Sequence, residues 1–313
     1  MEARRLISFG NSSYVISIPK NWLAKNGLNK GDFVYCAENG NNELILTPQQ
    51  KEVKRALRTV NLNVGKKVFK EVRREFLSYY IDGYDVINVQ SQLHLKYSNE
   101  LRDIIRDITT MDIVEQNKKM IIAKDFLNIE KISLEDLTRR MDLIIRSMIE
   151  DSKQYNRNKI AKVNSMDVEV NRITFMLFRF IKKALNDSNL AKLFGLTPED
   201  LLGLWLLASN LERVADEIKR IARFLRLLNI TKKEFEDIMV IYSMVEKEYL
   251  TAMKSFYNKD KELALSVAAN KDRIIEICNK FAAKSNKPYI GSLVEKFKGM
   301  EIFTVYLSRA VYE

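Results

Sequence analysis

Apolar residues in the C-terminal half of the chain recur every three or four positions over long stretches. The clearest run is Leu204, Ala208, Leu211, Ala215, Ile218, Ala222 and Leu225, a spacing that places them all on one stripe of a helix. Helix N-cap signatures precede three such stretches, at Ser133 with Asp136, Thr197 with Asp200, and Thr231 with Glu234. The pattern predicts helices at about 134–154, 159–186, 198–229, 232–257, 260–284 and 290–312. Two successive groups of three long helices indicate tandem three-helix bundles over residues 131–313.

The first fifty residues show a different pattern, with short runs of β-branched and aromatic residues separated by polar turns. It predicts strands at 6–8, 14–18, 33–36 and 43–47, a brief helix at 21–26 that Gly27 ends, and a turn at 39–42. So few residues bury too little apolar surface to offset the entropy of an ordered chain. Residues 1–50 therefore need a core from a second copy or from the rest of the protein.

Between these two parts, residues 51–130 read as a β-α-β unit followed by a helix and a hairpin. The expected elements are strands at 56–62 and 85–89, helices at 66–81 and 98–110, and hairpin strands at 112–115 and 119–123. This segment has three open roles: it holds a ligand, extends a dimer, or spaces the two ends, which is our default. The predicted fold class is multidomain α+β, with a small β domain, a short α/β segment and all-α tandem bundles.

The charge balance favours a polyanionic partner. The formal net charge is +11 and the isoelectric point is about 9.4, and nucleic acid is the commonest partner of so basic a chain. The excess is spread along the sequence, however, in groups such as Arg179, Lys182 and Lys183. We expect most of these residues to lie on solvated helix faces.

Residue usage argues against an enzyme and against a membrane protein. The single histidine, His94, lies in a polar stretch without a partner motif, and the glycines form no phosphate-binding loop or dinucleotide fingerprint. Cys36 and Cys278 are far apart and lack metal-ligand spacing, which fits a reducing cytoplasm. No apolar run approaches the length of a bilayer span. We therefore expect a cytoplasmic protein without membrane insertion.

Acidic residues lie beside the apolar stripe at helical spacing. Glu212 and Asp216 are four residues apart, as are Asp167 and Asn171 in the preceding long helix and Asp272 and Glu276 in a later one. Like charges on one helix face repel unless a cation lies between them, and oxygen ligands suit a hard cation or an iron or manganese cluster. Ordinary ion pairing is the alternative, because Asp216 precedes Arg220 by four residues and Arg213 precedes Glu217 by four.

The N-terminal segment carries a recognisable run of residues. It reads Gly10-Asn11-Ser12-Ser13-Tyr14-Val15-Ile16-Ser17-Ile18-Pro19-Lys20-Asn21-Trp22, then Gly27-Leu28-Asn29-Lys30-Gly31-Asp32. It resembles the AbrB/SpoVT family of swapped-hairpin DNA-binding domains. The resemblance implies that two chains interleave their hairpins and present basic residues to double-stranded DNA. The implied DNA contacts are Arg4, Arg5, Lys20 and Lys25, with Ser12 and Ser13 as positioning hydroxyls. The alternative is a dimerisation module that has lost DNA binding.

The acidic segments carry a second resemblance. Asn210-Leu211-Glu212-Arg213-Val214-Ala215-Asp216 with Ile221-Ala222, and Asp167-Val168-Glu169-Val170-Asn171-Arg172 with Arg179, resemble motifs of the PhoU family, as does the stretch 141–151. The order of the three parts is similar to archaeal phosphate-uptake regulators. The resemblance implies a divalent or ferric ion held by Glu212, Asp216, Asp167 and Asn171. Two departures weaken it: Asn171 replaces an Asp of the motif, and the last helix lacks the acidic repeat.

Together these resemblances imply a homodimeric transcription regulator of phosphate uptake. Residues 1–50 would bind DNA, 51–130 would link, and 131–313 would sense or transmit the signal. The alternative is an adaptor whose helical body docks on a phosphate-transport ATPase or another protein, with the N-terminal domain used only for dimerisation.

Overall fold

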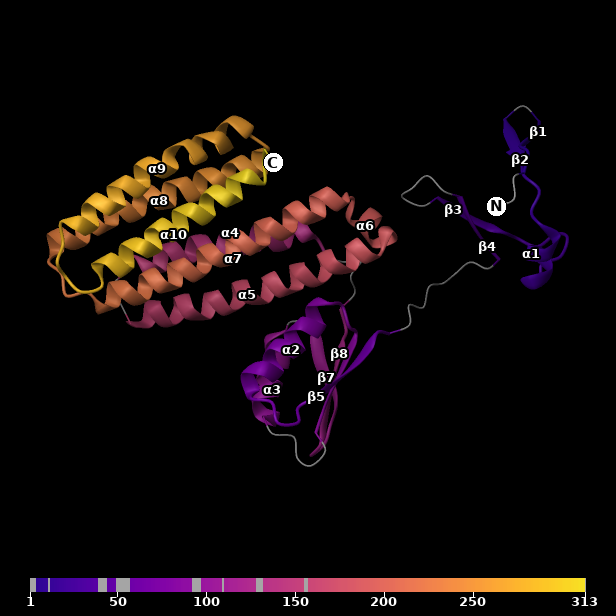
Figure 1. The fold of residues 1–313 in the computed structure, drawn as a ribbon, viewed down its shortest axis with the longest axis horizontal. Coiled ribbons are helices and arrows are strands. Elements are labelled where there is room, and N and C mark those ends of the chain that lie inside the picture. Colours follow the sequence, from indigo (N-terminus) through magenta and orange to yellow (C-terminus); the bar gives the residue numbers. More distant parts are fainter. Residues whose placement is uncertain are drawn as a thin grey trace. The chain divides into compact units, whose positions relative to one another are not determined.

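The computed structural model describes residues 4–10, 12–38, 44–48, 57–91, 97–108, 110–127, 132–154 and 157–312. The predicted turn at 39–42 and His94 lie outside the described residues. The chain divides into two compact units, Met1–Ala56 and Leu57–Glu313. Figure 1 shows the small β region, the α/β segment and the long helices in chain order. This confirms the predicted fold class.

The N-terminal unit consists of two small hairpins and one short helix. Strand β1 (Ile7–Phe9) pairs antiparallel with β2 (Ser13–Val15), and β3 (Tyr35–Glu38) pairs antiparallel with β4 (Leu44–Thr47), with α1 (Lys20–Lys25) between the hairpins. Gly10 adopts φ +70° at the first hairpin turn and Gly27 φ +65° after α1, conformations that glycine reaches without steric cost. The second strand is shorter than the predicted 14–18, because pairing with β1 ends at Val15.

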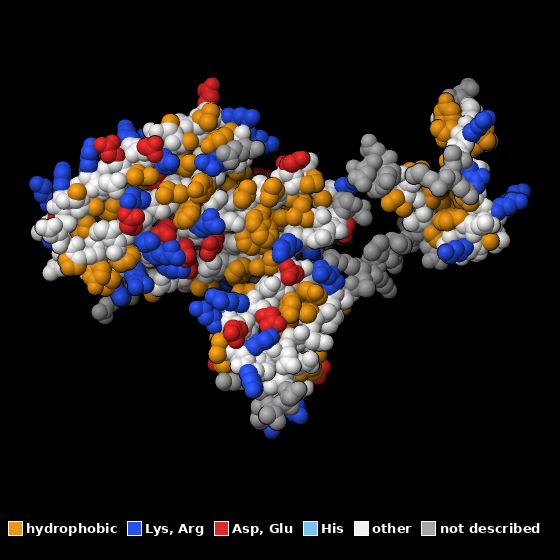
Figure 2. Space-filling view, in the orientation of Figure 1, with side chains coloured by type: hydrophobic (Ala, Val, Ile, Leu, Met, Phe, Trp, Pro, Cys, Tyr) orange, Lys and Arg blue, Asp and Glu red, His pale blue; other side chains and the backbone are white. Residues whose placement is uncertain are grey.

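None of the side chains described in this unit is buried. Many of its large apolar residues are solvent-exposed, among them Leu6, Phe9, Tyr14, Phe33 and Leu44. Apolar side chains accordingly lie on the surface of this unit in Figure 2. In the part of the chain that the structure describes, the N-terminal unit therefore has no core of its own.

The second unit begins with a mixed four-stranded sheet. Its elements are β5 (Thr59–Asn63), α2 (Phe69–Ile81), β6 (Val86–Gln90), α3 (Ser98–Asp107), β7 (Met111–Gln116) and β8 (Met120–Asp125). The strand order is β5-β6-β8-β7, with β5 and β6 parallel and the other pairs antiparallel. The helix α2 provides the crossover that a parallel pair requires. Residues such as Leu62, Phe76 and Ile121 form a core between the sheet and its helices.

Long helices make up the rest of the chain. They are α4 (Leu134–Ser152), α5 (Arg157–Asn186), α6 (Ser188–Phe194), α7 (Pro198–Leu227), α8 (Lys232–Asn258), α9 (Lys261–Ala283) and α10 (Ile290–Arg309). Helices α4, α5 and α7 pack together, α8, α9 and α10 form a second set, and α7 packs along α10. One continuous apolar core runs through both sets. The short helix α6 was not predicted, because seven residues are too few to show helical periodicity.

The predicted caps determine where three of these helices begin. The side chains of Ser133, Thr197 and Thr231 each accept a hydrogen bond from the backbone N–H three residues later. Asp200 and Glu234 return the contact to the backbone N–H of their capping threonines. These capping boxes satisfy backbone donors that a helix start otherwise leaves unpaired. The helix starts predicted from the sequence are confirmed at these positions.

Candidate functional site

The predicted DNA contacts are exposed in the N-terminal unit. Arg4 and Arg5 precede β1, whereas Lys20 and Lys25 mark the first and last residues of α1. Their side chains are all solvent-exposed, as phosphate contacts require before DNA binds.

The two predicted positioning serines lie at the turn of the first hairpin. Ser12 is the last turn residue and Ser13 begins β2, where its hydroxyl donates a hydrogen bond of 2.6 Å to the carbonyl oxygen of Phe9. This bond ties the end of β2 to the end of β1. Ser13 therefore stabilises the turn in the single chain, and a contact of either serine with DNA stays a prediction.

The acidic residues of the first bundle come together across α5 and α7. Asp167 lies on α5 and Asp216 on α7, and the Lys219 ammonium joins them, with Nζ 2.7 Å from Asp167 Oδ2 and 2.7 Å from Asp216 Oδ1. The amide of Asn171 donates a long hydrogen bond of 3.4 Å to Asp167 Oδ2. Lys219 is not part of the predicted site, although it follows Asp216 by three residues on the same helix face.

Burial and charge shift the pKa values in this cluster. The pKa of Glu212 is raised by burial and then by the negative charges of Asp216 and Asp167. Burial also raises the pKa of Asp167, partly opposed by its bond to Lys219. Burial opposes the charged form of Lys219, but its hydrogen bonds to Asp167 and Asp216 outweigh that effect and raise its pKa. The positive ammonium is thus stabilised where the two helices meet.

The donor set does not fit a metal ion in this arrangement. The position shared by Asp167 and Asp216 is filled by an ammonium, and Asn171 directs an amide N–H toward Asp167. Within the described residues, no group of three or more His, Cys, Asp and Glu side chains is placed to hold a metal ion. Metal binding by Glu212, Asp216, Asp167 and Asn171 stays a prediction.

Part of the alternative, ordinary ion pairing, is present beside this cluster. Arg220 Nη2 lies 2.9 Å from Asp216 Oδ2, as the four-residue spacing predicts. Glu217 is buried, and its partners are Arg220 and Lys296 rather than Arg213. The Arg213–Glu217 pair of that alternative is not formed, because Glu217 pairs with Arg220 and with Lys296 of α10, while the Arg213 guanidinium lies over the ring of Phe303. The absence of a side chain at Gly299 on α10 leaves room for the Glu217 carboxylate.

A second charged network, also missed from the sequence, joins α5 to the sheet. Arg179 is fully buried and hydrogen-bonds Asp125 at the end of β8, with Nε 3.1 Å from Oδ2. Lys183, one turn later, lies 3.0 Å from Asp85 Oδ1. Burial lowers the pKa of Lys183, as does the charge of Arg179, whereas its bond to Asp85 opposes the shift. Because the two cations face two carboxylates, the α/β segment is bound to the first bundle by paired buried charges.

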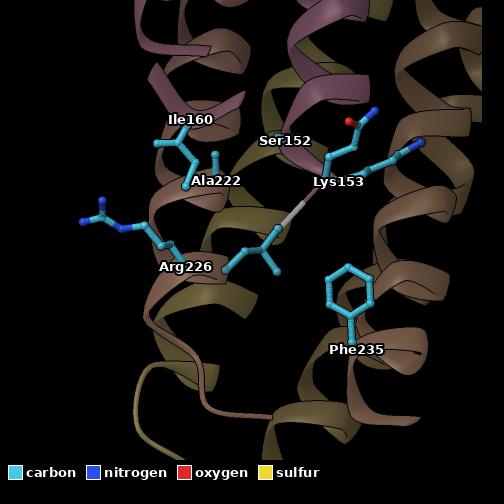
Figure 3. A pocket seen from close by; sticks show the side chains of 8 residues that line it. Ser152, Lys153, Ile160, Ala222, Arg226 and Phe235 are labelled. Atoms are coloured by element: carbon cyan, nitrogen blue, oxygen red, sulfur yellow. The ribbon is translucent and has the colours of Figure 1, made fainter. Parts of the chain in front are cut away.

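A small pocket lies near the end of the first bundle. Its enclosed volume is about 10 Å³, and it is lined by Ser152, Lys153, Gln154, Ile160, Ala222, Leu225, Arg226 and Phe235. Figure 3 shows side chains from several helices around it. Lys153 is already paired, with its Nζ 2.6 Å from Glu246 Oε2. The volume is below the usual range for small-molecule sites, so this pocket does not indicate a ligand.

Comparison with protein families identifies two regions of the chain. The family model described as "PhoU domain" matches residues 138–225. The model described as "Antidote-toxin recognition MazE, bacterial antitoxin" matches residues 7–54. The chain combines a PhoU domain with an N-terminal MazE/AbrB-type domain. No curated protein and no solved structure matches the chain.

These matches assign the two candidate sites to different domains. The PhoU domain spans most of α4, all of α5 and α6, and nearly all of α7, and so contains the acidic cluster. The MazE/AbrB-type domain contains all the predicted DNA contacts except Arg4 and Arg5, which lie just before the match at residue 7. Both families are regulatory, and in the described residues no helix is long and apolar enough to cross a membrane.

Proposed function

We propose that this chain is a dimeric DNA-binding transcription regulator whose PhoU domain couples DNA binding to phosphate status. The main support for the proposal is that no described side chain of the N-terminal unit is buried, although the family match includes both of its hairpins. A second copy supplies the missing core in this proposal. Dimerisation would then bring two sets of Arg4, Arg5, Lys20 and Lys25 to one DNA duplex.

The helical body supports the regulatory half of the proposal. Its first bundle matches the PhoU domain, which relates it to phosphate homeostasis, and the α/β segment is bound to that bundle through Arg179 and Lys183. A change in the bundle would therefore reach the α/β segment through direct contacts. The signal itself, a cytoplasmic location and an archaeal source stay predictions.

Duplex binding as a function of salt tests the DNA half. If the dimer neutralises about six to eight phosphates, log affinity should fall against log salt with a slope of about −5 to −7. Arg4→Ala with Arg5→Ala removes two positive charges per copy and should reduce the slope by about 2 to 4. Fluorescence anisotropy of the full chain with labelled duplex DNA measures this slope. The salt concentration is varied over about a sixfold range, from roughly 50 to 300 mM.

A matched variant controls for net charge. Lys232 and Lys233 are exposed at the start of α8, so Lys232→Ala with Lys233→Ala removes the same charge from the body and should leave the slope unchanged. Equal loss in both variants, or no salt-dependent binding by the full chain, would reject DNA binding. The adaptor alternative, docking on a phosphate-transport ATPase, would then be the better account.

A further inference from the structure

The Lys219 side chain reaches across the α5–α7 contact. It extends from α7, bonds Asp216 on its own helix at 2.7 Å and bonds Asp167 on α5 at the same distance. Two of its three N–H donors are thereby directed at carboxylates on two different helices. Both distances are typical of short charge-assisted hydrogen bonds.

The surrounding charges explain why a cation is needed at this position. Asp167, Glu212 and Asp216 act on one another as like charges, since the pKa of Glu212 responds to both aspartates. Arg220 pairs with the other carboxylate oxygen of Asp216, Oδ2, and with Glu217. Lys219 is the side chain that bonds carboxylates of both helices. Without its charge, Asp167 and Asp216 would face each other in a partly buried site, which is unfavourable.

We propose that Lys219 takes the place of the metal ion that the acidic motif predicts, so that a tethered ammonium neutralises the carboxylates and joins α5 to α7. The site then needs no metal from solution. The replacement of an expected aspartate by Asn171 agrees with this, because an internal monovalent cation requires fewer negative charges than a divalent or ferric ion. This inference does not depend on DNA binding.

Thermal unfolding of the full chain tests the substitution of metal by lysine. The melting temperature of the unaltered protein should be the same, within about 1 °C, in EDTA and in excess Mn²⁺, because no vacant cation position is left. Lys219→Met keeps an unbranched side chain that is one atom shorter and removes its charge. This variant should melt at a lower temperature in EDTA and recover by about 5 to 10 °C at a hundredfold excess of Mn²⁺ over Kd.

A second lysine provides the matched control. Lys280 pairs with Glu276 on the surface of α9, with Nζ 2.6 Å from Oε1 and both side chains exposed. Lys280→Met should lower the melting temperature little and should show no recovery with Mn²⁺, because an exposed pair contributes little. A Mn²⁺ response in this control would indicate non-specific binding and would count against the proposal.

Calorimetric titration of the unaltered protein with Mn²⁺ decides the question even if Lys219→Met fails to fold. Binding that is lost in Asp167→Asn would show that a metal displaces or accompanies Lys219, and would overturn the proposal. A folded Lys219→Met that is as stable as the parent and indifferent to Mn²⁺ would overturn it as well. Absence of Mn²⁺ binding in the parent would support it whether or not Lys219→Met folds, and a Mn²⁺-responsive variant would support it independently.

Discussion

The two units of this chain differ in where their apolar side chains lie. In the unit formed by residues 57–313, apolar residues fill a core under the sheet and a continuous core through both helical bundles. In the N-terminal unit, Phe33 is 80% exposed, and no described side chain is buried. The first unit therefore depends on something outside the single chain for its core, while the second does not.

This difference has an energetic consequence. Full burial of one large apolar side chain stabilises the folded state by about 1.5–3 kcal/mol. The second unit buries many such side chains, whereas the N-terminal unit leaves Leu6, Phe9, Tyr14 and Phe33 in solvent. Ordering a residue costs about 1–2 kcal/mol of backbone entropy. The N-terminal unit cannot offset that cost alone, so its folding and its association should form one equilibrium.

The largest expected effect follows from separating the units. An isolated fragment of residues 1–56 should be folded only as a dimer, and its apparent stability should change by about 2.7 kcal/mol for each hundredfold change in concentration. A fragment of residues 57–313 should unfold with a midpoint independent of concentration. Circular dichroism melts at several concentrations, with sedimentation equilibrium, measure both. A fragment 1–56 that stays folded as a monomer would remove the basis for the comparison.

How well the sequence predicts each part depends on how local the deciding interaction is. The caps at Ser133, Thr197 and Thr231 are confirmed because a cap and its partner lie three residues apart. Arg179 belongs to the basic residues of which most were expected on solvated faces, yet it is fully buried because α2 and the end of β8 pack against α5. That contact joins residues far apart in the sequence, and helical periodicity carries no information about it.

The acidic cluster shows the same limit. Its members Glu212, Asp216 and Asp167 are readable as i,i+4 motifs, and the structure does place Asp167 and Asp216 around one common partner. The identity of that partner, Lys219, depends on the side-chain geometry between two helices. DNA contact by Arg4, Arg5, Ser12, Ser13, Lys20 and Lys25 stays a prediction, because it depends on an assembly that a single chain does not contain.

The next largest effect should come from the buried ionic network in the second unit. Arg179→Met removes the cation that hydrogen-bonds Asp125 and leaves Lys183, whose Nζ lies 3.6 Å from Asp125 Oδ2. It should lower the free energy of unfolding by about 3–5 kcal/mol, because a buried carboxylate loses its hydrogen-bonded cation. Lys182 lies on the same helix, and its pair with Asp82 is half-exposed, so Lys182→Met should cost about 1 kcal/mol or less. Urea unfolding of the full chain, followed by circular dichroism, measures both. If both variants lost the same free energy of unfolding, the buried pair of Arg179 with Asp125 would contribute no more to stability than the half-exposed pair of Lys182 with Asp82.

The effect with the smallest change per step in conditions, about 1.4 kcal/mol per pH unit, concerns a buried acid in the second bundle. Glu301 of α10 is fully buried, and in the described part of the chain neither carboxylate oxygen has a hydrogen-bond partner; the same holds for the hydroxyl of Thr304, one turn later. Burial, and then the charge of Glu248 on α8, raises the pKa of Glu301 to about 8. Cys278 on α9 also faces this acid, and burial raises its pKa to about 11. Glu301 is therefore neutral in the folded protein at pH values where it is ionised in the unfolded chain.

The pH dependence of stability should reveal this acid. Its ordinary pKa is 4.5, so between about pH 4.5 and 8 the folded state binds a proton that the unfolded state lacks. The stability that Glu301 contributes is full below pH 4.5 and should decline by about 1.4 kcal/mol per pH unit up to pH 8. Glu301→Gln cannot ionise and should remove that decline, while Glu295→Gln, at an exposed position on the same helix, should retain it. Urea unfolding at about pH 5, 6.5 and 8 covers the range in which the decline is expected. It measures the free energy of unfolding of the parent and of both variants at each pH. Parallel pH profiles for the parent and Glu301→Gln would show that the second bundle admits water or a cation to this carboxylate, and that its interior is less closed than the continuous core indicates.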